Sequence, residues 1–271
     1  MHITSGAIRS WRPMRSRTHR SALQGALLLL FGATAAHAQR RSAGDGRSFH
    51  TLVLTTGMTS MSVGPLNAVL TNNRFAGLSS DGISYGASAY YAFGRALLGA
   101  DVARTTFGEE GLSNGRSDDL NATQLLATAS YALHSTAHFN VFPTLGVGVG
   151  QFDVTLRDRA GGAGSTTAAP TFDEIAQNPG ASSTLSGHHL LYSVGGGADW
   201  LITRSAAGNR GVVFGVRAGM LLAPNRTTWT SGGRGVIAGP DGSAAGPFLR
   251  VGMGIGGRCA VVGMGPARDP L

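Results

Sequence analysis

The stretch Leu190–Thr203, LLYSVGGGADWLIT, decides the fold class. Its side chains alternate strictly between apolar and small or polar, which is the period of a β-strand. One face carries large apolar side chains such as Tyr192 and Trp200, whereas the other is glycine-rich and holds Asp199. A solvated sheet would place Lys or Glu on its polar face, and this stretch has neither. A wide apolar face backed by small polar residues predicts a strand of a transmembrane barrel.

The same alternation recurs in seven further stretches, so the sequence predicts eight strands. In several of them the face opposite the apolar one is dominated by Gly and Ser, and 42 of the 271 residues are glycine. Glycine in strands is typical of curvature and of close backbone approach. The predicted strands are Thr51–Ser62, Gly82–Phe93, Arg95–Thr105, Asn121–Leu133, His138–Val154, Leu190–Thr203, Gly211–Leu222 and Pro247–Arg258.

The connections between these strands alternate in length. Gly94, His134–Ala137 and Arg204–Arg210 are short, and the other four connections are long. This asymmetry is typical of small outer-membrane barrels, with tight periplasmic turns and longer outer loops. We therefore expect an all-β fold, a closed eight-stranded antiparallel up-and-down transmembrane barrel. The polar, low-complexity composition of the long connections predicts mobile surface loops. These connections are Val63–Asp81, Thr106–Leu120, Thr155–Gly187 and Ala223–Gly246.

The N-terminal segment has the three parts of a secretory signal peptide. Five arginines precede an apolar run at Ala22–Ala36, and Ala36-His37-Ala38 is an A-x-A cleavage signature. The alternative, an uncleaved anchor, is disfavoured because about 15 residues are short for a span of roughly 20. Removing the five arginines lowers the formal net charge from +8 to +3. No nucleic-acid partner is therefore expected.

These features predict four parts. Residues 1–38 form a cleaved signal peptide, 39–48 a periplasmic linker, 49–258 an outer-membrane barrel and 259–271 a C-terminal tail. Cys259 is the single cysteine, which excludes an intrachain disulfide framework and a Cys-rich zinc site. We expect no metal and no cofactor.

Aromatic residues on the apolar faces indicate where the strands cross the membrane surfaces. Tyr192 and Trp200 share a face and lie about 26 Å apart along the strand at roughly 3.3 Å per residue. A tilt of about 40° reduces this to about 20 Å, near the spacing of two aromatic girdles. The predicted girdle residues are Tyr85, Tyr91, Phe93, Tyr131, Tyr192 and Trp200.

Charged residues also occur on the opposite, inward faces of the predicted strands. An eight-stranded barrel has an interior that side chains fill, and an unpaired charge there is costly. We therefore expect an internal carboxylate–guanidinium network in place of a conducting pore, the alternative being that some of these charges face water at the rim. The network residues are Asp101, Asp199, Arg217 and Arg250.

The chain resembles the eight-stranded outer-membrane barrels, the group that contains outer-membrane proteins A, X and W. The resemblance is carried by the signal peptide, the eight alternating strands and the terminal stretch GPFLRVGMGIGGR at Gly246–Arg258. It implies location in the bacterial outer membrane, contact with outer-membrane lipid including lipopolysaccharide, and insertion by the barrel assembly machinery. Such barrels usually end on an aromatic residue, whereas this chain continues through Cys259–Leu271.

Three functions are compatible with this fold. The favoured one is a non-catalytic structural or surface-interaction role. The second is a channel or transporter for a small solute. The third is a lipid hydrolase, for which His188 and His189 with Ser186 and Asp173 or Glu174 are the candidate residues. Adjacent histidines on a strand point to opposite faces, so hydrogen bonding of rim histidines to loop backbone is favoured. Two histidines are too few for a metal site. A soluble β-sandwich would need charged outer faces, which these strands lack.

Overall fold

The computed structural model describes residues 48–111, 115–136, 138–161, 164, 170–203, 210–224 and 227–259. The predicted signal peptide, its cleavage residues Ala36 and Ala38, the linker as far as residue 47 and the tail beyond Cys259 lie outside these residues.

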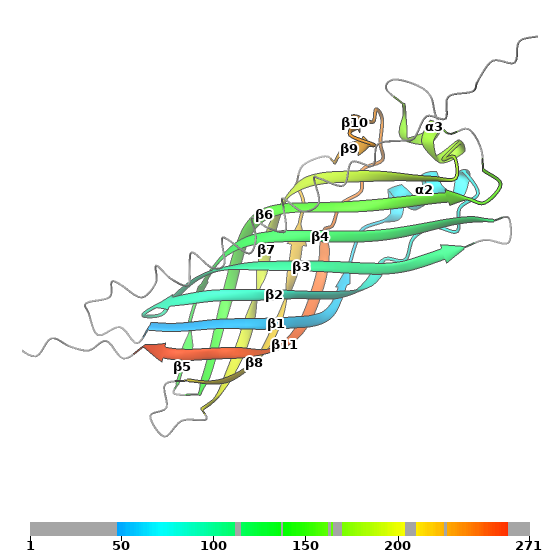
Figure 1. The fold of residues 1–271 in the computed structure, drawn as a ribbon. Helices are drawn as coiled ribbons and strands as arrows, with labels where there is room; N and C mark the ends of the chain where they lie inside the picture. Colours follow the sequence, from blue (N-terminus) through cyan, green and yellow to red (C-terminus); the bar gives the residue numbers. More distant parts are fainter. Residues whose placement is uncertain are drawn as a thin grey trace, which may run out of the picture. The chain divides into compact units, whose positions relative to one another are not determined.

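Eight long strands form a closed antiparallel ring (Figure 1), which confirms the predicted fold class. Each strand pairs with its neighbours in the sequence, and β1 closes the ring by pairing with β11 from Ser48↔Cys259 to Thr59↔Phe248. Closure leaves no open edge within the ring. The ring strands are β1 (Ser48–Ser60), β2 (Asp81–Phe93), β3 (Ala96–Gly111), β4 (Arg116–Tyr131), β6 (Phe139–Asp158), β7 (Ser182–Thr203), β8 (Arg210–Leu222) and β11 (Gly246–Cys259).

The two faces of β7 point as the alternation predicts. Tyr192, Trp200 and Ile202 are exposed on the outside, whereas Leu191 and Asp199 are buried in the lumen. The other ring strands follow the same rule, so large apolar side chains cover the outside of the barrel on all eight strands. This apolar band includes Leu54, Met58, Ile83, Leu98, Tyr131, Leu145, Val147, Val149, Val194, Phe214, Val216, Leu249, Val251 and Ile255. A surface of this kind faces hydrocarbon in membrane barrels.

Glycine on the inward face is required by the close approach of neighbouring backbones. A Cβ atom at Gly148 would lie 1.9 Å from the carbonyl oxygen of Leu125 on β4. A Cβ atom at Gly254 would lie 1.9 Å from the carbonyl oxygen of Leu52 on β1. Even alanine would force these strands apart, so the glycine pattern allows the tight curvature of a narrow barrel.

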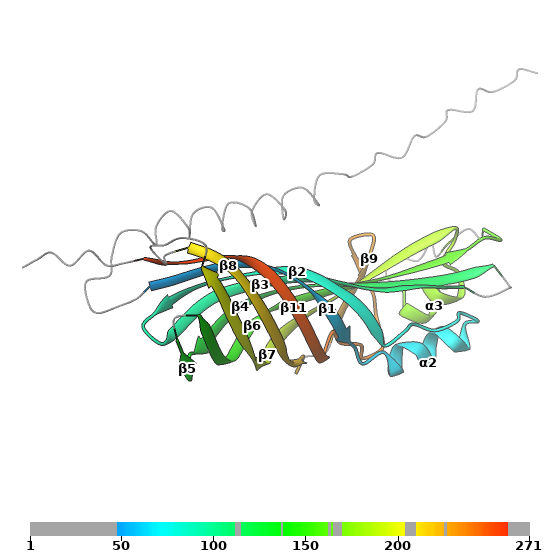
Figure 2. The same cartoon turned by 90° about the horizontal axis from the view of Figure 1, so that it is seen from below.

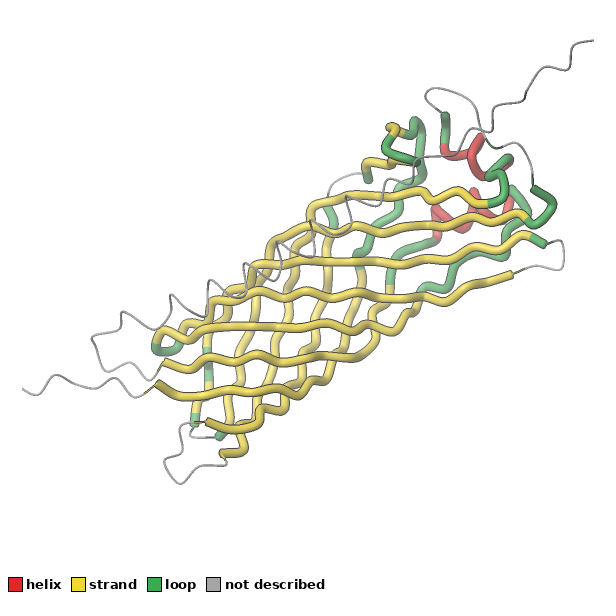
Figure 3. Tube along the Cα trace, in the orientation of Figure 1, coloured by secondary structure: helices red, strands yellow, loops and turns green. Residues whose placement is uncertain are grey.

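Some adjacent strands of the ring are longer than the others and extend past them at one end of the barrel (Figures 1 and 3). These are β3, β4, β6 and β7, whereas β1, β2, β8 and β11 stop near the rim. Along β6 the apolar positions change face: Val147 and Val149 point outward, but Phe152 and Val154 are buried on the inward side. The change follows from the surroundings, because lipid covers the outside of the band and protein covers the inside of the extension.

The inward side of this extension is covered by a folded cap. Helices α2 (Gly64–Asn72) and α3 (Phe172–Gln177) and the short strands β9 (Thr228–Ser231) and β10 (Arg234–Gly235) lie at this end of the barrel (Figures 1 and 2). Neither helix has the length and apolar character needed to cross a bilayer in the described residues. The cap and extension share one apolar core, formed by Leu66, Leu70, Phe75, Phe107, Leu120, Phe152, Val154, Leu156, Phe172, Ile175, Leu185 and Trp229, among others.

The prediction that the long connections are mobile surface loops is therefore wrong for much of their length. Residues 109–111 of β3 pair with 117–119 of β4, inside the predicted loop Thr106–Leu120. Residues 182–187, placed in the loop Thr155–Gly187, belong to β7, and α3 occupies part of the same connection. At the opposite end, β5 (His134–Ser135) pairs with β6 inside a predicted short turn. The polar composition was misleading because the few apolar residues of these connections converge on a single core.

Candidate functional site

The lumen brings the four predicted network residues together as two ion pairs. Arg217 Nη1 on β8 lies 2.7 Å from Asp199 Oδ1 on β7. Arg250 Nη1 on β11 lies 2.9 Å from Asp101 Oδ1 on β3. The two strands are separated in the ring by β1 and β2, so this pair spans part of the lumen. Asp199 is 1% exposed and Arg250 is 2% exposed. Buried charges in this setting need their partners, because an uncompensated charge in the interior is strongly destabilising.

Further polar residues complete these two pairs. The Tyr90 hydroxyl hydrogen-bonds both Asp199 and Arg217, and Ser88 Oγ donates to Asp101 Oδ2 at 2.6 Å. With its amide oxygen turned toward the guanidinium, Gln124 accepts from Arg250 Nη1 at 3.0 Å. None of these three was predicted as a site residue, although the alternation does place Ser88, Tyr90 and Gln124 on inward faces. Uncharged polar residues on an inward face were the signal that could have found them.

Apolar layers close the lumen on both sides of the charged pairs. On the side away from the cap, one cluster contains Val53, Leu97, Phe142, Leu201 and Val213, with Tyr90 packed against it. Toward the cap, Leu126, Leu191 and Leu221 pack with Phe248. The remaining hole between the layers has a volume of about 50 Å³. This is room for a few water molecules at most.

The predicted girdle residues lie on the outside of the barrel. Phe93, Tyr131 and Trp200 are exposed near the end of the barrel away from the cap, where Trp200 pairs across the sheet with Phe139 and Phe214. Tyr91 is half-buried beside Phe93, with ring centroids 4.6 Å apart. Tyr85 and Tyr192 are exposed toward the other border, where Tyr192 pairs with Leu222 at the end of β8.

The two candidate histidines point to opposite faces and have different surroundings. His189 Nε2 accepts a hydrogen bond from the Ala244 backbone N–H at 3.3 Å, so this histidine binds loop backbone at the rim. Burial, and to a smaller extent the neighbouring charge of His188, lower the pKa of His189 to about 4. His188 is exposed on the outside. Because Nε2 acts as an acceptor, His189 is neutral in this structure.

The acyl-transfer arrangement expected of a hydrolase is not assembled. Ser186 Oγ donates to Asp153 Oδ1 at 2.5 Å, whereas His189 Nε2 accepts from the Ala244 backbone N–H, so the two side chains bind other groups. Glu174 instead forms a capping box with Thr171 at the start of α3, and Asp173 accepts from Asn73 and Gln177. The described residues also contain no group of three or more His, Cys, Asp or Glu side chains that could hold a metal ion.

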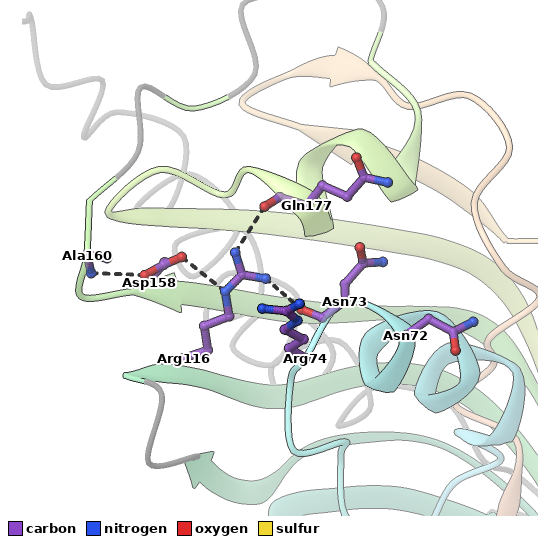
Figure 4. Close-up of a pocket in the computed structure, with 7 residues that line it drawn as sticks. All are labelled: Asn72, Asn73, Arg74, Arg116, Asp158, Ala160 and Gln177. Atoms are coloured by element: carbon purple, nitrogen blue, oxygen red, sulfur yellow. Dashed lines mark hydrogen bonds and ion pairs between the residues drawn. The ribbon is translucent and has the colours of Figure 1, made fainter.

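A polar hollow of about 360 Å³ lies in the cap, where α2 and α3 end (Figure 4). Arg116 on β4 occupies its centre: Nε pairs with Asp158 at 3.0 Å, Nη1 donates to the Asn73 carbonyl at 2.6 Å and Nη2 donates to the Gln177 carbonyl at 3.1 Å. The guanidinium therefore caps the negative C-terminal ends of both helices. It also stacks over the Phe75 ring at 5.3 Å. The polar groups around this hollow therefore attach the cap to the extended strands through Arg116.

Comparisons with known proteins find similarity only to solved structures, at low sequence identity. No family model matches the chain, and no curated protein matches it. Among solved structures, the chain is similar to Neisserial surface protein A, with a TM-score of 0.38 at 14% identity over 78% of this chain and 96% of that one. It is similar to Ail, the attachment invasion locus protein of Yersinia pestis, with a TM-score of 0.41 at 12% identity over 80% and 100% of the two chains. A major outer membrane protein from Thermus thermophilus gives a TM-score of 0.37 at 12% identity over 78% and 99%. The assignment of the fold rests on the strand pairing described above.

Proposed function

We propose that this protein is an integral barrel of the bacterial outer membrane whose role is non-catalytic: it holds a folded cap at the cell surface for contact with other molecules. The observation that supports this most directly is the one-sided extension of β3, β4, β6 and β7. On β6 it runs from Gln151 to Asp158, beyond the last outward apolar residue, Val149. At about 3.3 Å per residue, this part of the strand is roughly 25 Å long.

The interior of the cap supports a structural purpose for the extension. Phe152, Phe172 and Trp229 are each no more than 2% exposed, and Trp229 contacts both rings at centroid distances of 5.0 and 4.8 Å. A core of this size outside the membrane region gives the surface segments a fixed shape, which a binding surface requires. A barrel that served only to anchor loops would not need it.

The channel alternative receives less support, because two apolar layers and two ion pairs fill the lumen. The hydrolase alternative receives less support, because Ser186 is bonded to Asp153 and His189 to backbone. The proposal includes export by the N-terminal segment, insertion by the barrel assembly machinery and contact with outer-membrane lipid, including lipopolysaccharide.

Two measurements on the full chain test the proposal. In intact cells and in a Cys259→Ser background, a cysteine introduced at the β9–β10 tip, Gly233→Cys, should react with a membrane-impermeant maleimide, and a matched Gly94→Cys at the opposite end should not. Both glycines have positive φ and open surroundings, so the two sites are comparable. Purified protein in planar bilayers should show no steady single-channel steps. Labelling of the Gly94 variant alone, or sustained conductance, would contradict the proposal.

A further inference from the structure

One segment of the cap exposes a large apolar side chain to its surroundings. Ile237 is 57% exposed, whereas the other exposed large apolar side chains in the described part of the chain lie on the apolar band or at the end of the barrel opposite the cap. Ile237 follows β10, the last strand at the edge of the extended sheet, so a neighbouring molecule can approach it from the side. Single exposed apolar residues are common on protein surfaces, so the surroundings of Ile237 decide whether it is a contact site.

The backbone around Ile237 is fixed at several points. The Ile237 N–H donates to the Pro170 carbonyl at 3.1 Å, and the Ile237 carbonyl accepts from the Phe172 N–H at 3.2 Å. Three residues farther on, the Pro240 carbonyl accepts from Trp229 Nε1 at 2.9 Å. A backbone that is already ordered loses little conformational entropy when a partner binds, which favours association.

The residue that follows Ile237 has a strained backbone. Ala238 has a φ of 53°, in the left-handed region that residues other than glycine seldom adopt. Such a conformation costs about 1–3 kcal/mol and persists only where the surrounding structure holds it. Ala238 is itself exposed beside Ile237. The cap therefore keeps two apolar side chains in contact with water at a cost in free energy, which indicates that their exposure has a use.

Two exposed charged side chains flank this apolar pair. Arg234 lies three residues before Ile237, and Asp241 lies four residues after it. Neither forms an ion pair or a side-chain hydrogen bond with another residue that the structure describes. The two carboxylates at the start of α3 are bonded within the cap, so they do not neutralise Arg234. The 234–241 segment thus presents a cation, an apolar centre and an anion in that order.

This order makes the 234–241 segment complementary to a second copy of itself. Two copies related by a twofold axis present the same patch to each other. When the axis passes between Ile237 and Ala238, these apolar side chains meet at the centre. Arg234 of each copy then faces Asp241 of the other, so both unpaired charges gain a partner of opposite sign. Charges at the rim of a contact fix its register and its specificity.

The level of the segment above the membrane favours two copies in one bilayer. β10 runs back toward the membrane, and the N–H of Val236 donates to the Trp229 carbonyl on β9. Trp229 pairs with Gly187 on β7, whereas β7 begins at Ser182, about 17 Å farther out at roughly 3.3 Å per residue. A copy in an opposing membrane would meet the extended strands first, but a neighbour in the same membrane can reach Ile237 from the side.

From these observations we propose that the 234–241 segment is a contact surface between two copies of this protein in one membrane, with Ile237 near its centre and Arg234 paired with Asp241 of the second copy. The inference rests on the proposed function, because it requires the cap to stand beside a bilayer. A segment of this size is small against the roughly 20–30 residues that each side of a stable interface contributes. The association is therefore reversible, and the high local concentration within a bilayer makes it measurable there.

The test measures resonance energy transfer between copies of the full-length protein in phosphatidylcholine vesicles. Gly94→Cys in a Cys259→Ser background carries either a donor or an acceptor fluorophore, at the end of the barrel away from the cap. The unchanged segment should give transfer above the level of randomly distributed copies. Ile237→Asp should lower this excess about fivefold, because it places two carboxylates at the centre of the contact. Arg234→Asp and Asp241→Arg should each lower it as well.

Exchange of the two charges is the control that separates pairing from a general loss of structure. The double variant Arg234→Asp with Asp241→Arg keeps the segment complementary to itself with the signs reversed, so it should restore most of the excess transfer. Arg104→Asp makes the same charge change at an exposed position on β3, several strands away from β10. It should leave the transfer unchanged.

Three results would overturn the inference. The first is equal transfer with and without Ile237→Asp, and the second is failure of the charge-exchanged double variant to recover. The third is transfer only between donor and acceptor copies in separate vesicles, which would indicate contact across opposing membranes. Heat-modifiable migration in electrophoresis is recorded for every variant. Its loss with the unchanged segment would contradict the proposed function, whereas normal migration without excess transfer would contradict only this inference.

Discussion

At the scale of single residues, the Arg250–Asp101 pair makes the sharpest stability prediction. Arg250 is 2% exposed, and its carboxylate partner lies on a strand three positions away around the ring. Asp101→Ala would leave a guanidinium buried without its counter-charge, so we expect the free energy of unfolding to fall by about 3–5 kcal/mol. The measurement is urea unfolding in lipid vesicles, followed by heat-modifiable migration.

The exposed ion pair Arg157–Glu109 serves as a comparison for the buried pair Arg250–Asp101. Arg157 and Glu109 lie 2.9 Å apart on the exposed extension, and Arg157→Ala should change the unfolding midpoint little. Replacing both buried partners, as Asp101→Leu with Arg250→Met, should recover much of the stability lost in Asp101→Ala. If the double variant is as unstable as the single one, the loss arises from packing and not from the unpaired charge.

His189 predicts a dependence of cap stability on pH. Burial lowers its pKa from 6.5 to about 4, so between these values the unfolded chain binds a proton that the folded protein does not. The contribution of neutral His189 is therefore complete above pH 6.5 and is lost as the pH falls toward 4, with a total of about 3 kcal/mol. Urea midpoints at pH 7 and pH 4 measure it. His189→Gln should reduce the difference between them, whereas His188→Gln, at the exposed neighbour, should preserve most of it.

At the scale of elements, Arg116 on β4 connects the two helices of the cap to the extended barrel strands. Arg116→Ala removes hydrogen bonds to Asp158 and to the carbonyl ends of α2 and α3, and we expect it to destabilise the cap by about 2–3 kcal/mol. Hydrogen exchange should accelerate in both helices while the barrel amides stay protected. Arg116→Lys should rescue only part of the loss, because an ammonium cannot reach all three acceptors in the plane of a guanidinium. Uniform acceleration across barrel and cap would contradict this assignment.

The ring strands could be predicted from sequence within the apolar band, because lipid imposes one rule there. Outward side chains in the band meet hydrocarbon, so β7 alternates without interruption from Leu190 to Ile202. The pairing of the inward charges could also be predicted, because an unpaired charge such as Asp199 is costly in a narrow lumen without water. The hydrogen-bond partners of these charges depend on which strands face each other across the ring. Alternation along one strand does not contain this information, so Tyr90 and Gln124 could not be predicted as partners.

The cap could not be predicted in the same way, because its apolar residues follow a different rule. On β6 the apolar face changes from Val149 to Phe152, and a search for uninterrupted alternation ends the strand there. The change of face is itself a sequence signal: it marks the residue at which a strand leaves lipid and begins to cover a protein core. Trp229 and Phe172 are single apolar residues in polar connections. Their role in the core depends on contacts with segments distant in sequence, so the local sequence does not predict it.

At the scale of the whole molecule, the chain has two kinds of interior: a lumen enclosed by lipid-facing strands and an apolar core beyond the lipid. Beyond the predicted signal peptide, one of the two tryptophans lies on the outside of the barrel and the other lies in the core of the cap. Trp200 is 57% exposed on the apolar band, and Trp229 is 2% exposed in the cap. We expect nitroxide-labelled lipids to quench Trp200 and leave Trp229 unaffected, as measured in the single-tryptophan variants Trp229→Phe and Trp200→Phe.

The same two variants test whether the cap and the barrel unfold separately. The cap has an ordinary protein core facing water, whereas the ring is closed by hydrogen bonds that have no aqueous alternative within hydrocarbon. Urea should therefore shift the emission of Trp229 at a lower concentration than it shifts Trp200 or abolishes heat-modifiable migration. Phe152→Ala, which removes a ring that packs on Trp229, should lower the first midpoint by the equivalent of about 3–5 kcal/mol and leave the second unchanged. Coincident midpoints in all variants would instead show that the extension couples both interiors into one cooperative unit.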